Sequence, residues 1–283
     1  MQPDLRGGFV IRVAVLGAGL WGPGLPGWSD SVPVLRGERP YAEVAVPPPP
    51  PAMLSPTERR RTGLAVRLAL TVAAEASHAA GIAPGGCRSI FATANGDGAV
   101  INALLGTLAE AEPQVSPTLF HNSVHNAAAG YWSIGTGSQL SASCLGCHDA
   151  TFGAALLAAG AEAVVEQAPV LLCVYDAPLP FPLDATHPTR DTFGFALVLA
   201  PAADGGRGPH LTLRYAGEPA GSGERMPRLP ALRPLAAGNA AARSLRMLEA
   251  IARGEADRMH AEMLDGRLEI DVAPCSTAPA SAG

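Results

Sequence analysis

The sequence predicts an α/β protein in which helices cover both faces of a sheet, and three features support this class. Strand-like runs of β-branched residues alternate along the chain with helical runs of small apolar residues. The run from Val170 to Tyr175 is continuously apolar, as expected for a strand covered on both faces. With 283 residues, of which 48% are hydrophobic and 16% charged, the chain can bury a substantial core. We therefore expect a layered fold with a mainly parallel sheet.

The individual elements follow from periodicity and from stop signals. Runs of β-branched and apolar residues predict strands at residues 9–16, 87–94, 142–145, 170–175, 192–199, 211–215 and 268–272. Apolar residues at helical spacing predict helices at residues 56–80, 98–109, 127–136, 150–165 and 239–252. The first helix has the clearest start, because Ser55 can cap it, Pro56 suits its first position and Glu58 completes a capping box. Loops are expected at residues 17–28, 113–126 and 202–208, a polyproline spacer at 47–51 and a disordered tail at 276–283.

Composition excludes several classes of function. The formal charge is −5, and Arg59–Arg61 is the only basic run, so we expect no nucleic-acid surface. The longest apolar stretch, residues 151–161, is well short of the roughly 18 residues that a membrane span needs. Charged residues interrupt the N-terminal stretch, so no export signal is recognised and a cytoplasmic location is expected. Five cysteines are too few, and odd in number, for a disulfide scaffold.

Residues 17–22 (GAGLWG) match the glycine fingerprint of dinucleotide-binding folds and directly follow a predicted strand. That fingerprint requires a helix to begin at its third glycine, because the helix N-terminus holds the pyrophosphate. Pro23 and Pro26 follow too closely for such a helix. We therefore interpret the glycines as a turn.

Residues 144–148 (CLGCH) spell the attachment motif of c-type haem, which occurs in exported proteins. A redox pair of Cys144 and Cys147 at a helix N-terminus is chemically better founded, because a helix dipole lowers the pKa of a thiol. Two buried small side chains remain the interpretation that we favour.

His121 and His125 are four residues apart and could share a metal ion on a helix. No third ligand with suitable spacing accompanies them, so we expect hydrogen bonds at an interface instead. We expect no metal and no cofactor.

Residues 116–134 (SPTLFHNSVHNAAAGYWSI) resemble the segment that precedes the catalytic strand of β-ketoacyl synthases, in which a Ser-Pro and aromatic stretch leads into an Asn-x-x-Ala-Gly helix. The run ending Gly130–Ile134 is similar, more narrowly, to the short chain length factors found beside ketosynthases in aryl polyene pathways. The similarity spans about the first 200 residues. It implies a thiolase-like domain at residues 1–203, built on a single five-stranded mixed sheet with helices on both faces, and a small α+β extension at residues 204–283.

The resemblance also indicates a substitution at the nucleophile position. Counting forward from Gly130 by the spacing of the family lands on Asp149, so that Cys147, His148 and Asp149 replace Thr-Ala-Cys. A carboxylate is a poor acyl acceptor from a thioester. We interpret Asp149 as an ordinary helix cap.

The resemblance implies that the catalytic histidines of ketosynthases come from a second half, and we expect this sequence not to include that half. After Asp149 only His187, His210 and His260 remain, and none lies in a recognisable synthase context. We therefore expect no catalytic residue and no condensation by this chain alone. Cys144 and Cys147 are the fallback nucleophiles.

In ketosynthases the segment that matches residues 117–129 lies at the dimer interface and reaches the acyl pocket of the partner. The implied interface and pocket residues are Leu119, Phe120, His121, Asn122, His125 and Asn126. The expected function is that of a non-catalytic chain length factor, which forms a heterodimer with a full-length β-ketoacyl synthase and shapes its acyl pocket in type II fatty acid or polyketide synthesis of the aryl polyene type. Acyl carrier protein is a further candidate partner. Two alternatives remain: an active acyltransferase or ketosynthase using Cys144 or Cys147, and a CxxC redox protein.

Overall fold

The computed structural model describes residues 9–202, 208–217 and 225–275, and the expected disordered tail and most of the loop at 202–208 lie outside them. The described strands are β1 (Val10–Gly22), β2 (Leu25–Pro26), β3 (Arg88–Ala92), β4 (Ala142–Leu145), β5 (Val170–Asp176), β6 (Phe193–Pro201), β7 (His210–Ala216), β8 (Asp257–Met263) and β9 (Gly266–Ala273). The described helices are α1 (Trp28–Leu35), α2 (Pro56–Arg61), α3 (Leu64–Ala79), α4 (Gly98–Leu108), α5 (Pro117–Ser123), α6 (Ala127–Thr136), α7 (Thr151–Glu166), α8 (Arg233–Gly238) and α9 (Leu245–Arg253). Short 3₁₀ turns are η1 (Leu183–Ala185), η2 (Pro230–Leu232) and η3 (Ala241–Ser244).

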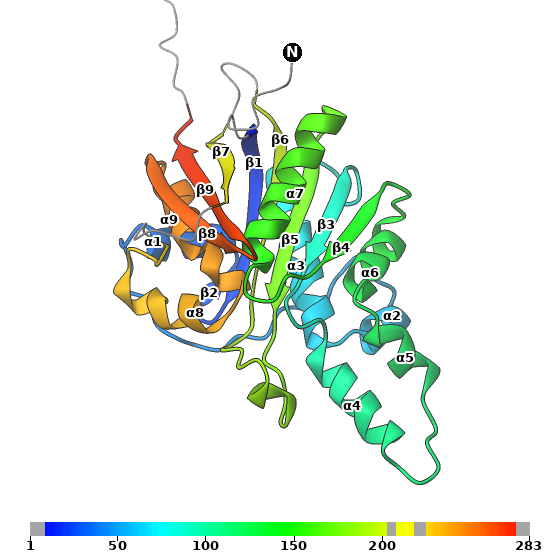
Figure 1. Cartoon of the computed structure of the whole chain (residues 1–283). Helices are drawn as coiled ribbons and strands as arrows, with labels where there is room; N and C mark the ends of the chain where they lie inside the picture. The colour runs from blue at the N-terminus through cyan, green and yellow to red at the C-terminus, as the bar shows by residue number, and fades with distance from the viewer. Residues whose placement is uncertain (1–8, 203–207, 218–224, 276–283) are drawn as a thin grey trace, which may run out of the picture.

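One open, mixed sheet organises the described residues, in the order β4-β3-β5-β6-β1-β7-β9-β8, with β2 paired to β1 (Figure 1). Its portion from β4 to β1 is the expected five-stranded mixed sheet. Only β3 pairs in parallel, with β4 and with β5, and the other ladders are antiparallel. The expectation of a mainly parallel sheet was therefore wrong, because a strand buried on both faces has the same apolar pattern in either direction.

Helices cover both faces of this sheet, and the alternation along β5 shows how. Val170, Leu172 and Val174 join a core that includes Phe152, Leu156 and other residues of α7. The intervening residues, Leu171 and Cys173, join a second core with α3 and α6. Successive side chains of a strand point to opposite faces, so a continuously apolar strand fills both cores.

The C-terminal residues extend the same sheet instead of forming a separate layer. Strand β7 pairs with β1, β9 with β7 and β8 with β9. Their inward side chains enter the core that contains α7. The sequence prediction missed β8, because its charged residues (DRMHAEM) hide the alternation.

Several boundaries differ from the expected ones. Strand β1 continues through the glycine motif to Gly22, so no loop begins at Gly17. The long helix expected from Pro56 is broken at Thr62, whose backbone is extended, although Ser55 caps its start as expected by accepting a hydrogen bond from the Glu58 amide at 3.2 Å. Helices α1 and α5 were not expected, since α1 contains a proline and α5 has only seven residues in a polar stretch. None of the helices in the described ranges has the length and apolar character to cross a membrane.

Candidate functional site

Asp149 lies in the short connection between β4 and α7. The cap position of α7 belongs to Ala150, and no side chain caps this helix. The interpretation of Asp149 as an ordinary helix cap was therefore wrong. The connection is instead held by Thr151, whose hydroxyl accepts from the Cys147 amide at 3.0 Å and donates to the His148 carbonyl at 2.6 Å. The carboxylate of Asp149 contacts two segments from elsewhere in the chain.

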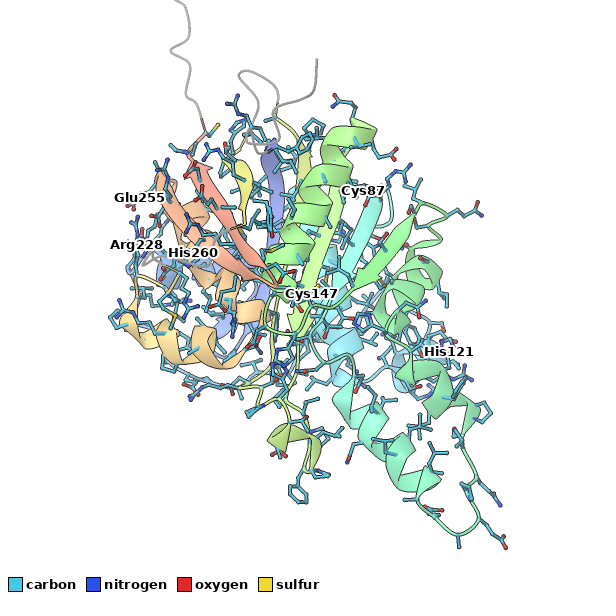
Figure 2. The ribbon with its side chains drawn as sticks, viewed as in Figure 1. Cys87, His121, Cys147, Arg228, Glu255 and His260 are labelled. Atoms are coloured by element: carbon cyan, nitrogen blue, oxygen red, sulfur yellow. The ribbon has the colours of Figure 1, made fainter. Side chains whose placement is uncertain are left out.

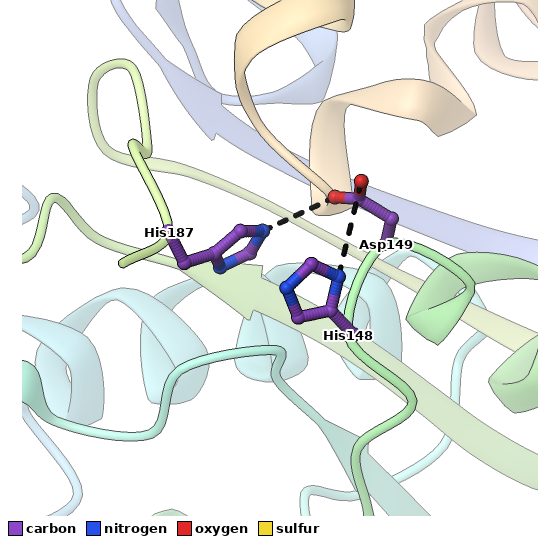
Figure 3. Close-up of side chains that lie close together, drawn as sticks. All are labelled: His148, Asp149 and His187. Carbon is purple, nitrogen blue, oxygen red and sulfur yellow. Dashed lines mark hydrogen bonds and ion pairs between the residues drawn. The ribbon is translucent and has the colours of Figure 1, made fainter. Parts of the chain in front are cut away.

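The first of these segments brings His187 from the connection between β5 and β6 (Figure 3). Its Nε2 lies 3.1 Å from Asp149 Oδ1, and its Nδ1 lies 2.6 Å from Asn95 Oδ1. Asn95 in turn donates to Thr189 Oγ1 at 2.7 Å. The imidazole is thus held between two oxygen acceptors, and its ring orientation is defined from both sides.

The second segment brings Arg243 from η3. Its Nη2 lies 2.9 Å from Asp149 Oδ2, and its Nη1 lies 2.9 Å from Glu262 Oε2. Partial burial by itself would raise the pKa of Asp149, but the hydrogen bond from His187 and the charge of Arg243 outweigh it and lower that pKa. Asp149 is therefore a carboxylate at neutral pH.

His148 completes the cluster. It is one of few non-glycine residues with positive φ, at 51°. Its ring lies over that of His187, with centroids 4.0 Å apart, and its Nδ1 is 3.9 Å from Asp149 Oδ2 (Figure 3). Two imidazoles and a carboxylate thus converge at the entrance of α7.

A cavity of about 200 Å³ opens beside this cluster. Its polar lining comes from Asp149, Arg225, Arg243, His260 and Glu262. Burial lowers the pKa of His260, and the neighbouring Arg225 and Arg267 lower it further. Figure 2 shows His260 on the β8 side of the molecule.

The two candidate thiols lack the surroundings of a catalytic cysteine. Burial raises the pKa of Cys144, which disfavours the thiolate. Both Cys144 and Cys147 are free thiols and are partly exposed, so the interpretation of them as two buried side chains was wrong. No imidazole in the described ranges is hydrogen-bonded to either sulfur. These observations weigh against the acyltransferase and redox alternatives.

The chain matches the family model described as "Beta-ketoacyl synthase, N-terminal domain" over residues 36–258, which is more than half of its length. The chain belongs to the β-ketoacyl synthase family. The match also extends past residue 203, through β7 and to the start of β8.

Solved structures of ketosynthases and chain length factors have the same fold. The chain is similar to "Ketosynthase (ApeO) in Complex with its Chain Length Factor (ApeC) from Xenorhabdus doucetiae", with a TM-score of 0.68, 19% identity, and 92% of this chain and 99% of that one covered. It is also similar to "The ishigamide ketosynthase/chain length factor", with a TM-score of 0.66, 15% identity, and 93% and 98% covered. A β-ketoacyl synthase from Burkholderia phymatum STM815 matches with a TM-score of 0.62, 12% identity, and 94% and 100% covered. No curated protein matches the sequence.

The residues that the ketosynthase resemblance assigned to an interface lie on α5 and in the turn that follows. Phe120 is 62% exposed, and His121 is exposed with its ring edge-on to Tyr131. Leu119 is half-buried, and Asn126 is exposed at the start of α6. These four residues therefore remain available at or near the surface.

The other two predicted residues make contacts within the chain. Asn122 is buried, donates to the Arg61 carbonyl at 2.8 Å and accepts from the Tyr131 hydroxyl at 2.9 Å. His125 is exposed, with Nε2 3.3 Å from the Thr93 carbonyl oxygen. Helix α5 ends at Ser123, so His121 and His125 do not share a helix.

Sequence reasoning located Asp149 but missed its partners His187 and Arg243, and it missed Asn95, which contacts His187. His187 is 38 residues from Asp149 and Arg243 is 94 residues from it. Neither lies in a local motif, so no signal along the chain pointed to them.

Proposed function

We propose that this chain is a non-condensing, ketosynthase-like subunit that pairs with a full-length β-ketoacyl synthase and limits the length of its acyl product, in synthesis of the aryl polyene type. The observation that carries the proposal is the ionised Asp149 at the entrance of α7, where the family resemblance places the nucleophilic cysteine.

The chemistry of Asp149 supports a non-condensing role. Attack on a thioester requires a nucleophile whose acyl adduct is stable enough to be transferred, as a thiolate provides and a carboxylate does not. The ion pair with Arg243 and the hydrogen bond with His187 also engage both carboxylate oxygens. The site therefore lacks a free nucleophile at this position.

An exposed apolar arm supports the pairing. Helices α4 and α5 project from the body of the molecule in Figure 1. In α4 (GAVINALLGTL), Gly98 is the only buried residue. Leu105, Leu108, Phe120 and Val124 are all exposed on the arm. Burying these exposed apolar side chains against another protein would stabilise the arm, so the arm is suited to bind a protein partner.

The open edge of the sheet lies on the same side. Strand β4 is the last strand beyond β3, and Ala142 and Ser143 at its start are exposed. An edge strand presents unpaired backbone N–H and C=O groups that a partner strand can satisfy. The arm and this edge are the two parts of the candidate interface, and similar structures include a ketosynthase in complex with its chain length factor.

The pairing is tested by co-expression with a full-length β-ketoacyl synthase from the same organism, followed by size-exclusion chromatography. We expect co-elution of the two chains, and its loss in Phe120→Asp, because a charge on a buried contact residue is costly. Val165→Asp is the matched control, since Val165 is 78% exposed on α7 and away from the arm. Equal co-elution of Phe120→Asp and Val165→Asp would rule out the arm as the interface.

The non-condensing role has a separate test. The purified chain is incubated with acyl-loaded acyl carrier protein and its intact mass is measured. We expect no acyl adduct on the wild-type chain. Stoichiometric acylation would refute the non-condensing role, whatever the result of the pairing experiment.

A further inference from the structure

We propose that His148, Asp149 and His187 form a binding site for a divalent transition-metal cation such as Zn²⁺. One candidate ligand atom from each residue lies within 4.8 Å of those of the other two. Two imidazoles and one carboxylate are a donor set suited to first-row divalent metals. This inference does not depend on the proposed pairing, because every ligand comes from this chain.

The distances fit a shared cation. Zinc lies about 2.0–2.2 Å from imidazole nitrogen and carboxylate oxygen, which places two ligand atoms of one tetrahedral site roughly 3–3.5 Å apart. His187 Nε2 and Asp149 Oδ1 are 3.1 Å apart. His148 Nδ1 is 3.9 Å from the other carboxylate oxygen, Asp149 Oδ2, and the His148 side chain is 63% exposed, so its ring is free to move toward a cation held by Oδ1.

His187 is already oriented as a ligand. Metal-binding histidines usually donate their other ring N–H to an oxygen acceptor, which fixes the tautomer that leaves the ligating nitrogen free. Asn95 Oδ1 lies 2.6 Å from His187 Nδ1 and fills this role. Nε2 then faces Asp149 Oδ1, and a cation shared by the two atoms lies to one side of the line that joins them. A bound cation replaces any proton on Nε2.

The backbone of His148 is a second, independent observation. Its φ of 51° is unfavourable for a residue with a β-carbon, and such strain concentrates at functional sites. In this conformation the ring lies over His187, with centroids 4.0 Å apart. A conventional backbone at this point would direct the side chain elsewhere.

Arg243 opposes a cation but leaves room for one. It occupies Asp149 Oδ2 at 2.9 Å, so Oδ1 remains the ligating oxygen. Glu262, 2.9 Å from Arg243, offsets its positive charge. Three protein ligands leave at least one coordination position open for water or a substrate oxygen, as in catalytic metal sites. We expect micromolar rather than nanomolar affinity, because the guanidinium repels the ion.

The site is tested on the purified full chain after chelator treatment. Zn²⁺ and Co²⁺ are titrated by calorimetry, and circular dichroism verifies that each variant is folded. We expect one ion per chain and binding at least about tenfold weaker in His187→Ala, Asp149→Asn and His148→Asn. Asparagine tolerates the left-handed backbone, so His148→Asn removes the ligand while preserving the local conformation.

The matched control is His78→Ala, because His78 is exposed at the end of α3 and far from Asp149 along the chain. This variant should bind both metals like the wild type. Wild-type binding no tighter than that of His187→Ala would overturn the proposal. A thiolate-to-cobalt absorption band would also overturn it, since that band would assign a cysteine as ligand. The outcome of the pairing experiment with Phe120→Asp is independent of both metal-binding results.

Discussion

Asp176 anchors the loop from Thr93 to Asn95, which lies beside His187 in the candidate site. It is fully buried at the end of β5, and its Oδ1 accepts from the Thr93 hydroxyl and from the Ala94 amide, each at 2.8 Å. Asn95, the next residue, contacts His187. Burial raises the pKa of Asp176 to about 6, although these hydrogen bonds act in the opposite direction. One buried carboxyl group therefore anchors the segment that ends at Asn95, the residue in contact with His187.

We predict a fall in stability with rising pH that depends on Asp176. Between its ordinary pKa of 3.8 and about 6, the folded chain retains a proton that the unfolded chain releases, so the free energy of unfolding decreases as pH rises. The fall should amount to about 3 kcal/mol by pH 7. Asp176→Asn keeps one oxygen acceptor and should lack this component. Urea unfolding of both proteins between pH 4 and 7 measures the difference, and parallel curves would contradict the prediction.

At the scale of elements, the contact between β1 and α3 explains why a glycine-rich stretch is a strand. A β-carbon at Gly17 would lie 2.4 Å from the Ala76 carbonyl oxygen, and one at Gly19 would lie 2.2 Å from the Val72 carbonyl oxygen. The glycines therefore allow the helix backbone to pack directly on the strand. Sequence patterns alone cannot distinguish this close approach from a turn, because both require glycine.

We predict opposite effects for two glycine-to-alanine substitutions. Gly19→Ala should lower the free energy of unfolding by about 3 kcal/mol, because strand and helix must move apart. Gly106→Ala should raise it by up to about 1 kcal/mol, because Gly106 is in the last turn of α4 with no atom within 4 Å of the added carbon. Thermal and urea unfolding give both values. A neutral Gly19→Ala would show that α3 is not packed against β1 in this way.

At the scale of the whole molecule, the C-terminal strands complete the core and the site. Strand β7 covers the edge of β1, and Leu211 and Ile270 are fully buried in the core shared with α7. A nearly buried pair, Arg246 with Asp257, joins α9 to β8 with Nε to Oδ2 at 2.6 Å. Arg243 reaches Asp149 from the same part of the chain. The domain boundary at residue 203 is therefore a proposal that folding experiments can test.

We predict that residues 1–203 do not fold as an independent unit. Removing β7, β9 and β8 would expose the edge of β1 together with one side of the core, and exposed apolar edges aggregate. The full chain should unfold in one cooperative transition. Calorimetry of the full chain and of the fragment tests this prediction, and a cooperative transition in the fragment would establish two separate units.

The local sequence pattern was sufficient to predict an element wherever the residues of one short segment define its type and its ends. The bounds of β4 and α6, the strand at Val170 and the Ser55 cap were all predicted from neighbouring residues. The family resemblance supplied the five-stranded part of the sheet. It also singled out Asp149.

The meeting of Asp149 with His187 and Arg243, and the continuation of the sheet through β7, β9 and β8, depended on the folded chain. Periodicity and capping act over a few residues, so they are visible in a single sequence. Contacts between residues 38 or 94 positions apart arise only when the order of strands brings distant connections to the same end of the sheet.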